Sequence, residues 1–164
     1  MNLSGIGEIK LNAADRLKIF LDGIERYING HNLNPSPFNP EFAIAETFSL
    51  EQLGRLTQDE CFNYGLQLYQ YADHVAREKA QCETVLIWCE HNLQSVIASE
   101  INSGEWGTYA KHETKVATII KENTFANKIN EWKMAAQCRI ENLKSREYNI
   151  RRKAEILFEK GKRK

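Results

Sequence analysis

Apolar side chains recur in steps of four and three residues through the central part of the chain, from about Gln58 to Asn102. This spacing is typical of a helix that packs against another helix along its length. Thr57, followed three residues later by a glutamate, forms a capping-box pattern at its start. Such a helix is roughly 65 Å long at about 1.5 Å per residue, more than a small globular core requires. The pattern therefore indicates a helical arm or a subunit interface, with Leu86, Leu93 and Val96 on its seam.

A second periodic segment begins at Thr124 and continues to Lys164. Its seam positions are Ile140, Leu143, Ile150 and Leu157. Between the two periodic segments, residues 103–107 contain two glycines and predict a hairpin turn, and residues 109–123 predict a short helix. We therefore expect an all-α fold in which residues 57–164 form a long hairpin with coiled-coil-like arms and build an oligomer. Whether the arms pack within one chain or between chains stays open.

Residues 1–56 have weaker patterns and predict a small N-terminal helical module. A first helix is expected from Ala13, capped by the preceding asparagine, to the Asn-Gly pair ending at Gly30. Residues 31–40 contain all three prolines and predict a linker or an ordered Ω-type loop. Ser49 then forms a capping-box pattern for a short helix that ends near residue 56.

The formal net charge is zero, but the charges are strongly separated along the chain. Residues 1–108 carry 7 Lys and Arg against 15 Asp and Glu, whereas residues 109–164 carry 15 against 7. Blocks of one sign determine the potential that a partner meets within about 10 Å of the surface. The basic half predicts an anionic partner, and the acidic half predicts a docking face for a basic partner or a neighbouring subunit.

The sequence contains no pattern typical of an enzyme or a metal site. There is no glycine-rich phosphate loop and no GxSxG elbow, and the four histidines lie far apart. The four cysteines form no CxxC pair, so we expect buried thiols in a reducing compartment and no metal or cofactor. No apolar segment approaches the ~18 residues that span a bilayer, and the N-terminus has no leader pattern. A cytoplasmic protein without a membrane partner is expected.

Nucleic-acid binding fits the basic half better than catalysis does. Cations at helical spacing neutralise phosphates without reading bases, and aromatic side chains beside them stack on unpaired bases. Trp106 and Tyr109 stand beside Lys111 and Lys115 in this way. The candidate phosphate-binding residues of the final helix are Lys144, Arg146, Arg151, Arg152 and Lys153.

Two short motifs in this region resemble the UvsY family of T-even-type phages. The segment from Tyr109 to Lys115 has the pattern Y-x-K-x-E-x-K, and Leu-Lys-Ser-Arg at 143–146 is followed by Ile-Arg at 150–151. Proteins of that family are recombination mediators that work as oligomeric rings. The resemblance extends more loosely back over residues 66–104, where a tyrosine-rich helix ends at a Ser-Gly turn, so that it covers about 66–164. The family also carries basic and paired tyrosine residues just before this turn, and residues 96–102 of this chain have neither.

The resemblance implies a protein of the host cytoplasm that binds single-stranded DNA and loads a recombinase onto DNA covered by single-strand-binding protein. It implies that the DNA surface lies on Lys111, Lys115 and the C-terminal cations. The alternative is a structural or adaptor coiled-coil protein, whose cations only meet the acidic half of a neighbouring subunit.

Overall fold

The computed structural model describes residues 11–31, 33 and 38–163, and within these ranges it contains six helices and no strand. The all-α expectation is therefore confirmed. In chain order the elements are α1 (Ala13–Gly30), the 3₁₀ helix η1 (Pro40–Thr47), α2 (Leu50–Arg55), α3 (Gln58–Ser103), α4 (His112–Glu122) and α5 (Thr124–Lys162).

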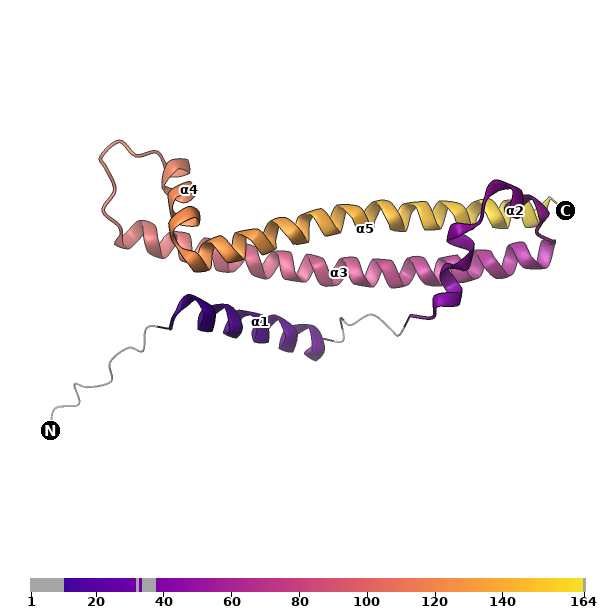
Figure 1. The fold of residues 1–164 in the computed structure, drawn as a ribbon, viewed down its shortest axis with the longest axis horizontal. Coiled ribbons are helices and arrows are strands. Elements are labelled where there is room, and N and C mark those ends of the chain that lie inside the picture. Colours follow the sequence, from indigo (N-terminus) through magenta and orange to yellow (C-terminus); the bar gives the residue numbers. More distant parts are fainter. Residues whose placement is uncertain (1–10, 32, 34–37, 164) are drawn as a thin grey trace.

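Helices α3 and α5 lie side by side and antiparallel for most of the length of the molecule (Figure 1), which confirms the long hairpin. The capping box at the start of α3 forms as predicted, because Thr57 and Glu60 exchange side-chain to backbone hydrogen bonds. The two arms pack on each other within one chain. Of the predicted seam residues, Leu86 and Ile140 are half-buried, and the buried ones are Leu93, Val96, Leu143, Ile150 and Leu157.

Two apolar clusters hold the hairpin together, one towards each end. The cluster that we name the strap-end core joins α3 to the second half of α5 and includes Leu68, Val75, Ile150 and Leu157. Gly65 permits close approach there, because a Cβ at this position would lie 2.8 Å from Cε2 of Phe158.

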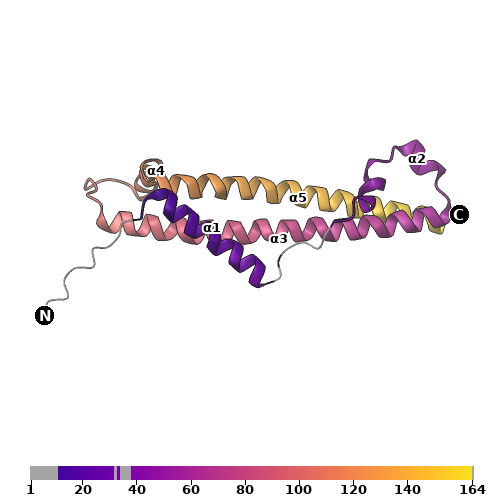
Figure 2. The same cartoon turned by 60° about the horizontal axis from the view of Figure 1, so that its bottom comes forward.

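The second cluster, which we name the tip-end core, joins α1 and the later part of α3 to the start of α5. It includes Phe20, Cys89, Phe125 and Ile129. Helix α1 crosses α3 obliquely in this half of the molecule (Figure 2), and Phe20 contacts Phe125 edge-on with ring centroids 6.5 Å apart.

The described part of residues 1–56 contacts the hairpin at two different places. Helix α1, whose predicted cap Asn12 accepts a hydrogen bond from the Asp15 amide, packs against the tip-end core. Residues 40–56, which we name the strap, pack at the other end, near the C-terminus of the chain (Figure 1). The 3₁₀ helix in the strap was not predicted; it begins within the expected loop 31–40, because Asn39 caps it. Residues 32 and 34–37 of that loop lie outside the described ranges.

The cysteine prediction is correct for two thiols and wrong for one. Cys61 and Cys89 are buried, Cys82 is half-buried, and Cys138 is exposed on α5. Burial raises the pKa of the Cys89 thiol to about 11. Among the described residues, no helix is long and apolar enough to cross a membrane, and no group of acidic, histidine and cysteine side chains is arranged to hold a metal ion.

Candidate nucleic-acid interface

The tip of the hairpin, residues 103–123, begins where a glycine stops α3. The Gly104 amide donates a hydrogen bond to the Glu100 carbonyl at 2.9 Å. A Cβ at Gly104 would lie 2.8 Å from that same oxygen, so a larger residue there would displace the backbone. Lys111 precedes α4 and makes no side-chain cap hydrogen bond. The chain therefore crosses between α3 and α4 as an exposed connection.

Four of the predicted DNA-binding residues gather at this tip. Tyr109 is 96% exposed, and Lys111 beside it is exposed as well. The Lys115 ammonium lies 5.7 Å from the centre of the Trp106 ring, in a cation–π arrangement. Trp106 itself is half-buried against the tip-end core, so Tyr109 is the aromatic ring that stands free for stacking.

The tip also has an acidic side. A cavity of about 550 Å³ lies between the end of α3 and α4, and its lining includes Glu100, Glu105 and Glu122. Carboxylates repel phosphate, so this cavity is unsuitable for a nucleic-acid backbone. Trp106 also lines this cavity, whereas Tyr109 and Lys111 are not among its lining residues, so an anionic ligand would meet these two side chains outside it.

Arg146, one of the predicted cations of α5, is held by the strap. Its guanidinium donates two hydrogen bonds to the Glu46 carboxylate, at 3.3 and 3.2 Å, and its carbon lies 5.3 Å from the centre of the Tyr71 ring. Hydrogen bonding to Glu46 raises the pKa of Arg146. A bidentate pair of this kind satisfies the geometry that would otherwise bind a phosphate.

Lys153 also points to the strap. Its ammonium donates to the Glu46 carbonyl at 2.6 Å and to the Phe48 carbonyl at 3.1 Å. Burial lowers the pKa of Lys153, although the nearby Glu46 carboxylate acts in the opposite direction.

Arg151 is held by α3 and by its own helix. It bonds to Asp73 at 2.8 Å and to Glu147 at 3.1 Å, and Glu147 also accepts a hydrogen bond from Lys79 at 2.7 Å. A partly buried ionic network therefore links α3 to α5, made by Asp73 and Lys79 on α3 and Glu147 and Arg151 on α5.

The remaining predicted cations are more accessible. Arg152 makes an exposed ion pair with Glu155, one turn away on α5. Lys144 is exposed and has no ion pair with any residue that the structure describes. The predicted residues therefore form two groups, one at the tip and one on α5 towards the opposite end of the hairpin (Figure 1), and they do not make a single site.

The sequence also contains a regular spacing of cations that the count of charged residues does not reveal. Arg139 and Lys160 stand in steps of seven with Arg146 and Lys153, so all four share one face of α5. Arg139 approaches Glu78 at 4.0 Å, and Lys160 donates to the Leu53 carbonyl of the strap.

Comparisons of the chain with protein-family models, with curated proteins and with solved structures found no match. The resemblance to the UvsY family therefore rests on the sequence alone. In the structure, the motif at 109–115 forms the exposed approach to α4 and its first turn, and the motif at 143–146 lies on α5.

Proposed function

We propose that this protein is a non-enzymatic accessory protein that binds single-stranded DNA at the tip of its helical hairpin. The observation that carries the proposal is Tyr109, almost fully exposed beside Lys111, with Lys115 close by. Neither lysine forms an ion pair with a described residue; Lys111 is exposed, and the half-buried Lys115 has the Trp106 ring as its partner. The more specific role, a recombination mediator that helps load a recombinase onto DNA covered by single-strand-binding protein, is supported by the sequence resemblance.

The chemistry of the tip favours unpaired over paired nucleic acid. A protruding tyrosine ring can stack on a base only where that base is not enclosed in a duplex, and such stacking contributes about 1–3 kcal/mol per base. Two lysines that neutralise two phosphates of a single strand add a salt dependence of about −1.4 in the slope of log K against log salt concentration. Binding of this kind tolerates any sequence, as a protein that acts along DNA requires.

Fluorescence anisotropy with a labelled oligonucleotide tests the proposal. Replacing Tyr109 by alanine should weaken binding by roughly 5- to 150-fold, the equivalent of one lost stacking contact. Tyr148→Ala is the matched control, because Tyr148 is an exposed tyrosine on α5, and we expect it to leave the affinity unchanged. Absence of binding at low salt, or equal effects of the two substitutions, would refute a binding site at the tip.

A homo-oligomer, which we also propose, has to use surfaces other than the two seams. The seams pack on each other within the chain, so they are occupied. Exposed apolar side chains such as Ile87 and Met134 remain on the outer faces of α3 and α5. Light scattering at micromolar concentration measures the assembly directly, and a monomer would contradict this part of the proposal.

The second candidate is a structural or adaptor protein that does not bind DNA. The observation in its favour is that Arg146, Arg151 and Lys153 bond to oxygen atoms of the same chain. If these internal partners are the only function of the basic helix, oligonucleotides will fail to bind while the hairpin stays folded and assembled.

A further inference from the structure

A row of four cations extends along one face of α5. Arg139, Arg146, Lys153 and Lys160 are separated by seven residues each, which is almost two helical turns, so their side chains follow one another along the helix. The row spans roughly 32 Å at about 1.5 Å per residue. This length and regularity suit a linear polyanion better than a compact anion.

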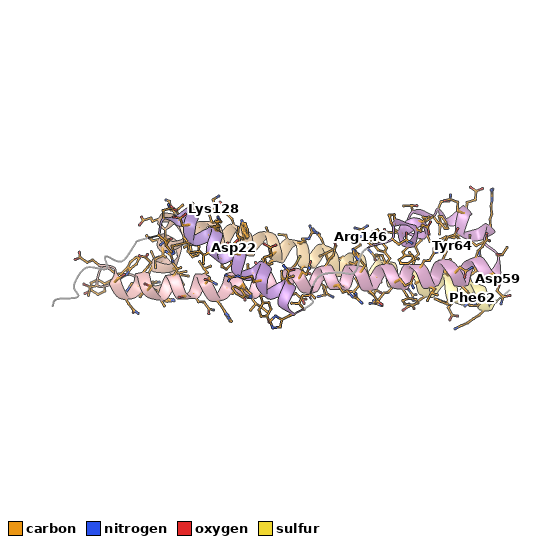
Figure 3. The ribbon with its side chains drawn as sticks, turned by 90° about the horizontal axis from the view of Figure 1, so that it is seen from below. Asp22, Asp59, Phe62, Tyr64, Lys128 and Arg146 are labelled. Atoms are coloured by element: carbon orange, nitrogen blue, oxygen red, sulfur yellow. The ribbon has the colours of Figure 1, made fainter. Side chains whose placement is uncertain are left out.

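Oxygen atoms of the strap accept hydrogen bonds from three of these four cations, although the Arg146 side chain stays 51% exposed. Arg146 bonds to the Glu46 carboxylate, Lys153 to the carbonyls of Glu46 and Phe48, and Lys160 to the carbonyl of Leu53. In Figure 3, Arg146 lies where the strap meets the hairpin. The strap therefore presents a series of acceptor oxygens to a series of donors on α5.

The negative charge of the strap does not balance the positive charge of the three cations that bond to it. The strap gives the three cations one carboxylate, that of Glu46, and otherwise neutral carbonyls. Burial lowers the pKa of Lys153, which means that its charge is poorly compensated in this state. A phosphate backbone brings one negative charge per nucleotide, so it would compensate this row better than the strap does.

The strap is anchored unevenly along its length. Helix α2 has six residues, none of them buried, and Leu50 at its start is 88% exposed. Its apolar anchors are the buried Ala45 and Leu56 and the partly buried Phe42, Ala43, Phe48 and Leu53. The Phe48 ring lies edge-on to Tyr64 with the ring centroids 5.0 Å apart. Short 3₁₀ and single-turn helices depend on their surroundings for stability. They form few hydrogen bonds, and these do not offset the conformational entropy lost when the backbone is ordered.

We propose that Arg146, Lys153 and Lys160 form a second, covered phosphate-binding surface, and that residues 40–56 are a displaceable strap whose oxygens take the places of phosphates. The inference rests on the proposed function, because its ligand is the single-stranded DNA that the tip binds. A strand held at the tip would extend along α5 only after it displaced the strap. The surface then adds contacts to a bound strand without being open to every anion.

Glu46→Gln tests the proposal in the full-length chain, because it keeps the shape of the side chain but removes the charge that holds Arg146. We expect the variant to bind a labelled oligonucleotide roughly three- to ten-fold more tightly, the equivalent of replacing charge-assisted hydrogen bonds by neutral ones. The slope of log K against log salt concentration should steepen by up to about 2, for three more phosphates. Adding Lys153→Ala and Lys160→Ala to this variant should remove most of the gain and leave the part that Arg146 supplies.

Glu51→Gln is the matched control, because it removes the same charge from the same strap. Glu51 is exposed and pairs with Arg55 one turn away, so it does not hold α5. Hydrogen exchange of the wild-type chain gives a second readout: with the oligonucleotide bound, the amides of Phe42, Phe48 and Leu53 should exchange faster, because their hydrogen bonds lie within the strap or at its start.

The outcomes separate this proposal from that of the tip. If Glu46→Gln and Glu51→Gln bind the oligonucleotide with the affinity of the wild type while Tyr109→Ala binds it more weakly, the proposal of a covered surface is overturned. The proposal of a binding site at the tip is then retained. A gain in Glu46→Gln with no effect of Tyr109→Ala would support the covered surface and overturn the tip. If a polyglutamate peptide competes as well as the oligonucleotide, the row recognises acidic protein and the assignment to DNA is overturned.

Discussion

The two ends of the hairpin differ in how they use their cations. At the strap end, Arg146, Lys153 and Arg151 bond to carboxylates and carbonyls of the same chain. At the tip, Lys111 and Lys115 have no such partner among the described residues, and Tyr109 protrudes beside them. Both regions belong to the half of the sequence that has excess positive charge. The excess of positive charge in the sequence thus predicts which half of the chain attracts anions. Which of its cations can bind a ligand depends on whether they already bond to carboxylates or carbonyls of the same chain.

The two ends also differ in what crosses between the helices. The tip-end core includes helix α1 and has one ion pair beside it, between Lys133 and Glu90 at 3.6 Å, whereas the strap-end core is bordered by the larger ionic network around Glu147. Lys79 and Glu147, 2.7 Å apart, link α3 to α5 on the strap-end side of the molecule's middle. The substitutions below test whether these ends behave as one cooperative unit.

The largest loss of stability is expected from replacing either of two buried isoleucines on α5, one in each core. Ile129 in the tip-end core and Ile150 in the strap-end core are 0% and 1% exposed, and replacing either by alanine should lower the free energy of unfolding by about 2–5 kcal/mol. Ile156 on the same helix is 50% exposed, so Ile156→Ala should cost less than about 1 kcal/mol. Urea denaturation followed by circular dichroism measures all three. Two separate transitions, each sensitive to one buried isoleucine, would show that the ends unfold independently.

A smaller effect is expected from Glu147→Gln. Burial alone would raise the pKa of this carboxyl, but hydrogen bonds from Lys79 and Arg151 outweigh it and lower the pKa. A lowered pKa stabilises the fold above the ordinary carboxyl pKa, and this contribution is lost as the pH falls from about 5 through the lowered value. The variant should lose about 1–3 kcal/mol at pH 7 and less in acid.

The matched control for that pH profile is Glu141→Gln. Glu141 is an exposed residue of α5 without an ion pair among the described residues, so its replacement should leave the dependence on pH unchanged. If both variants follow the same profile, the network around Glu147 does not stabilise the strap end.

Gly65→Ala should give the next effect. Alanine favours a helix by about 1 kcal/mol, but its Cβ would push the Phe158 ring, which packs against Tyr69 and Phe62, so we expect a net loss of about 1–2 kcal/mol. Gly54→Ala on α2 has nothing within 4 Å of the new Cβ and should stabilise the fold by up to about 1 kcal/mol. Thermal unfolding compares the two, and stabilisation by both would show that the helices are not in close contact at Gly65.

The smallest effect on stability belongs to the tip. Tyr109→Ala should change the free energy of unfolding by less than about 0.5 kcal/mol, because the ring contacts solvent rather than the core. The same variant is expected to lose DNA affinity, so stability and binding should separate at this residue. A large loss of stability would mean that Tyr109 is a structural residue.

Local features of the fold could be predicted from the sequence because they depend on neighbouring residues. The caps at Asn12, Ser49 and Thr57 each need a side chain and an amide two or three positions away, and all three form. The hairpin followed from two long seams with a glycine-containing break between them. The 3₁₀ helix of the strap was missed, since it depends on packing of Ala45 against the strap-end core as well as on the Asn39 cap.

The candidate sites were less predictable, because they depend on contacts between distant parts of the chain. Glu46 and Arg146 are 100 positions apart, and nothing near either residue indicates the other. The exposure of Tyr109 likewise results from the path of the tip connection and not from its helical spacing. The row of cations on α5 was visible in the sequence as steps of seven, but the strap that covers it was not.

The exposed thiol of Cys138 makes the unmodified chain suitable for site-specific labelling. Thiolate is the reactive form, and burial holds the pKa of Cys89 at about 11, while the pKa of the half-buried Cys82 is raised as well. A maleimide dye should therefore attach first at Cys138, on α5 between the tip and the segment that carries Arg146. Energy transfer from this one position to a dye on an oligonucleotide end would report how far along the hairpin a bound strand extends.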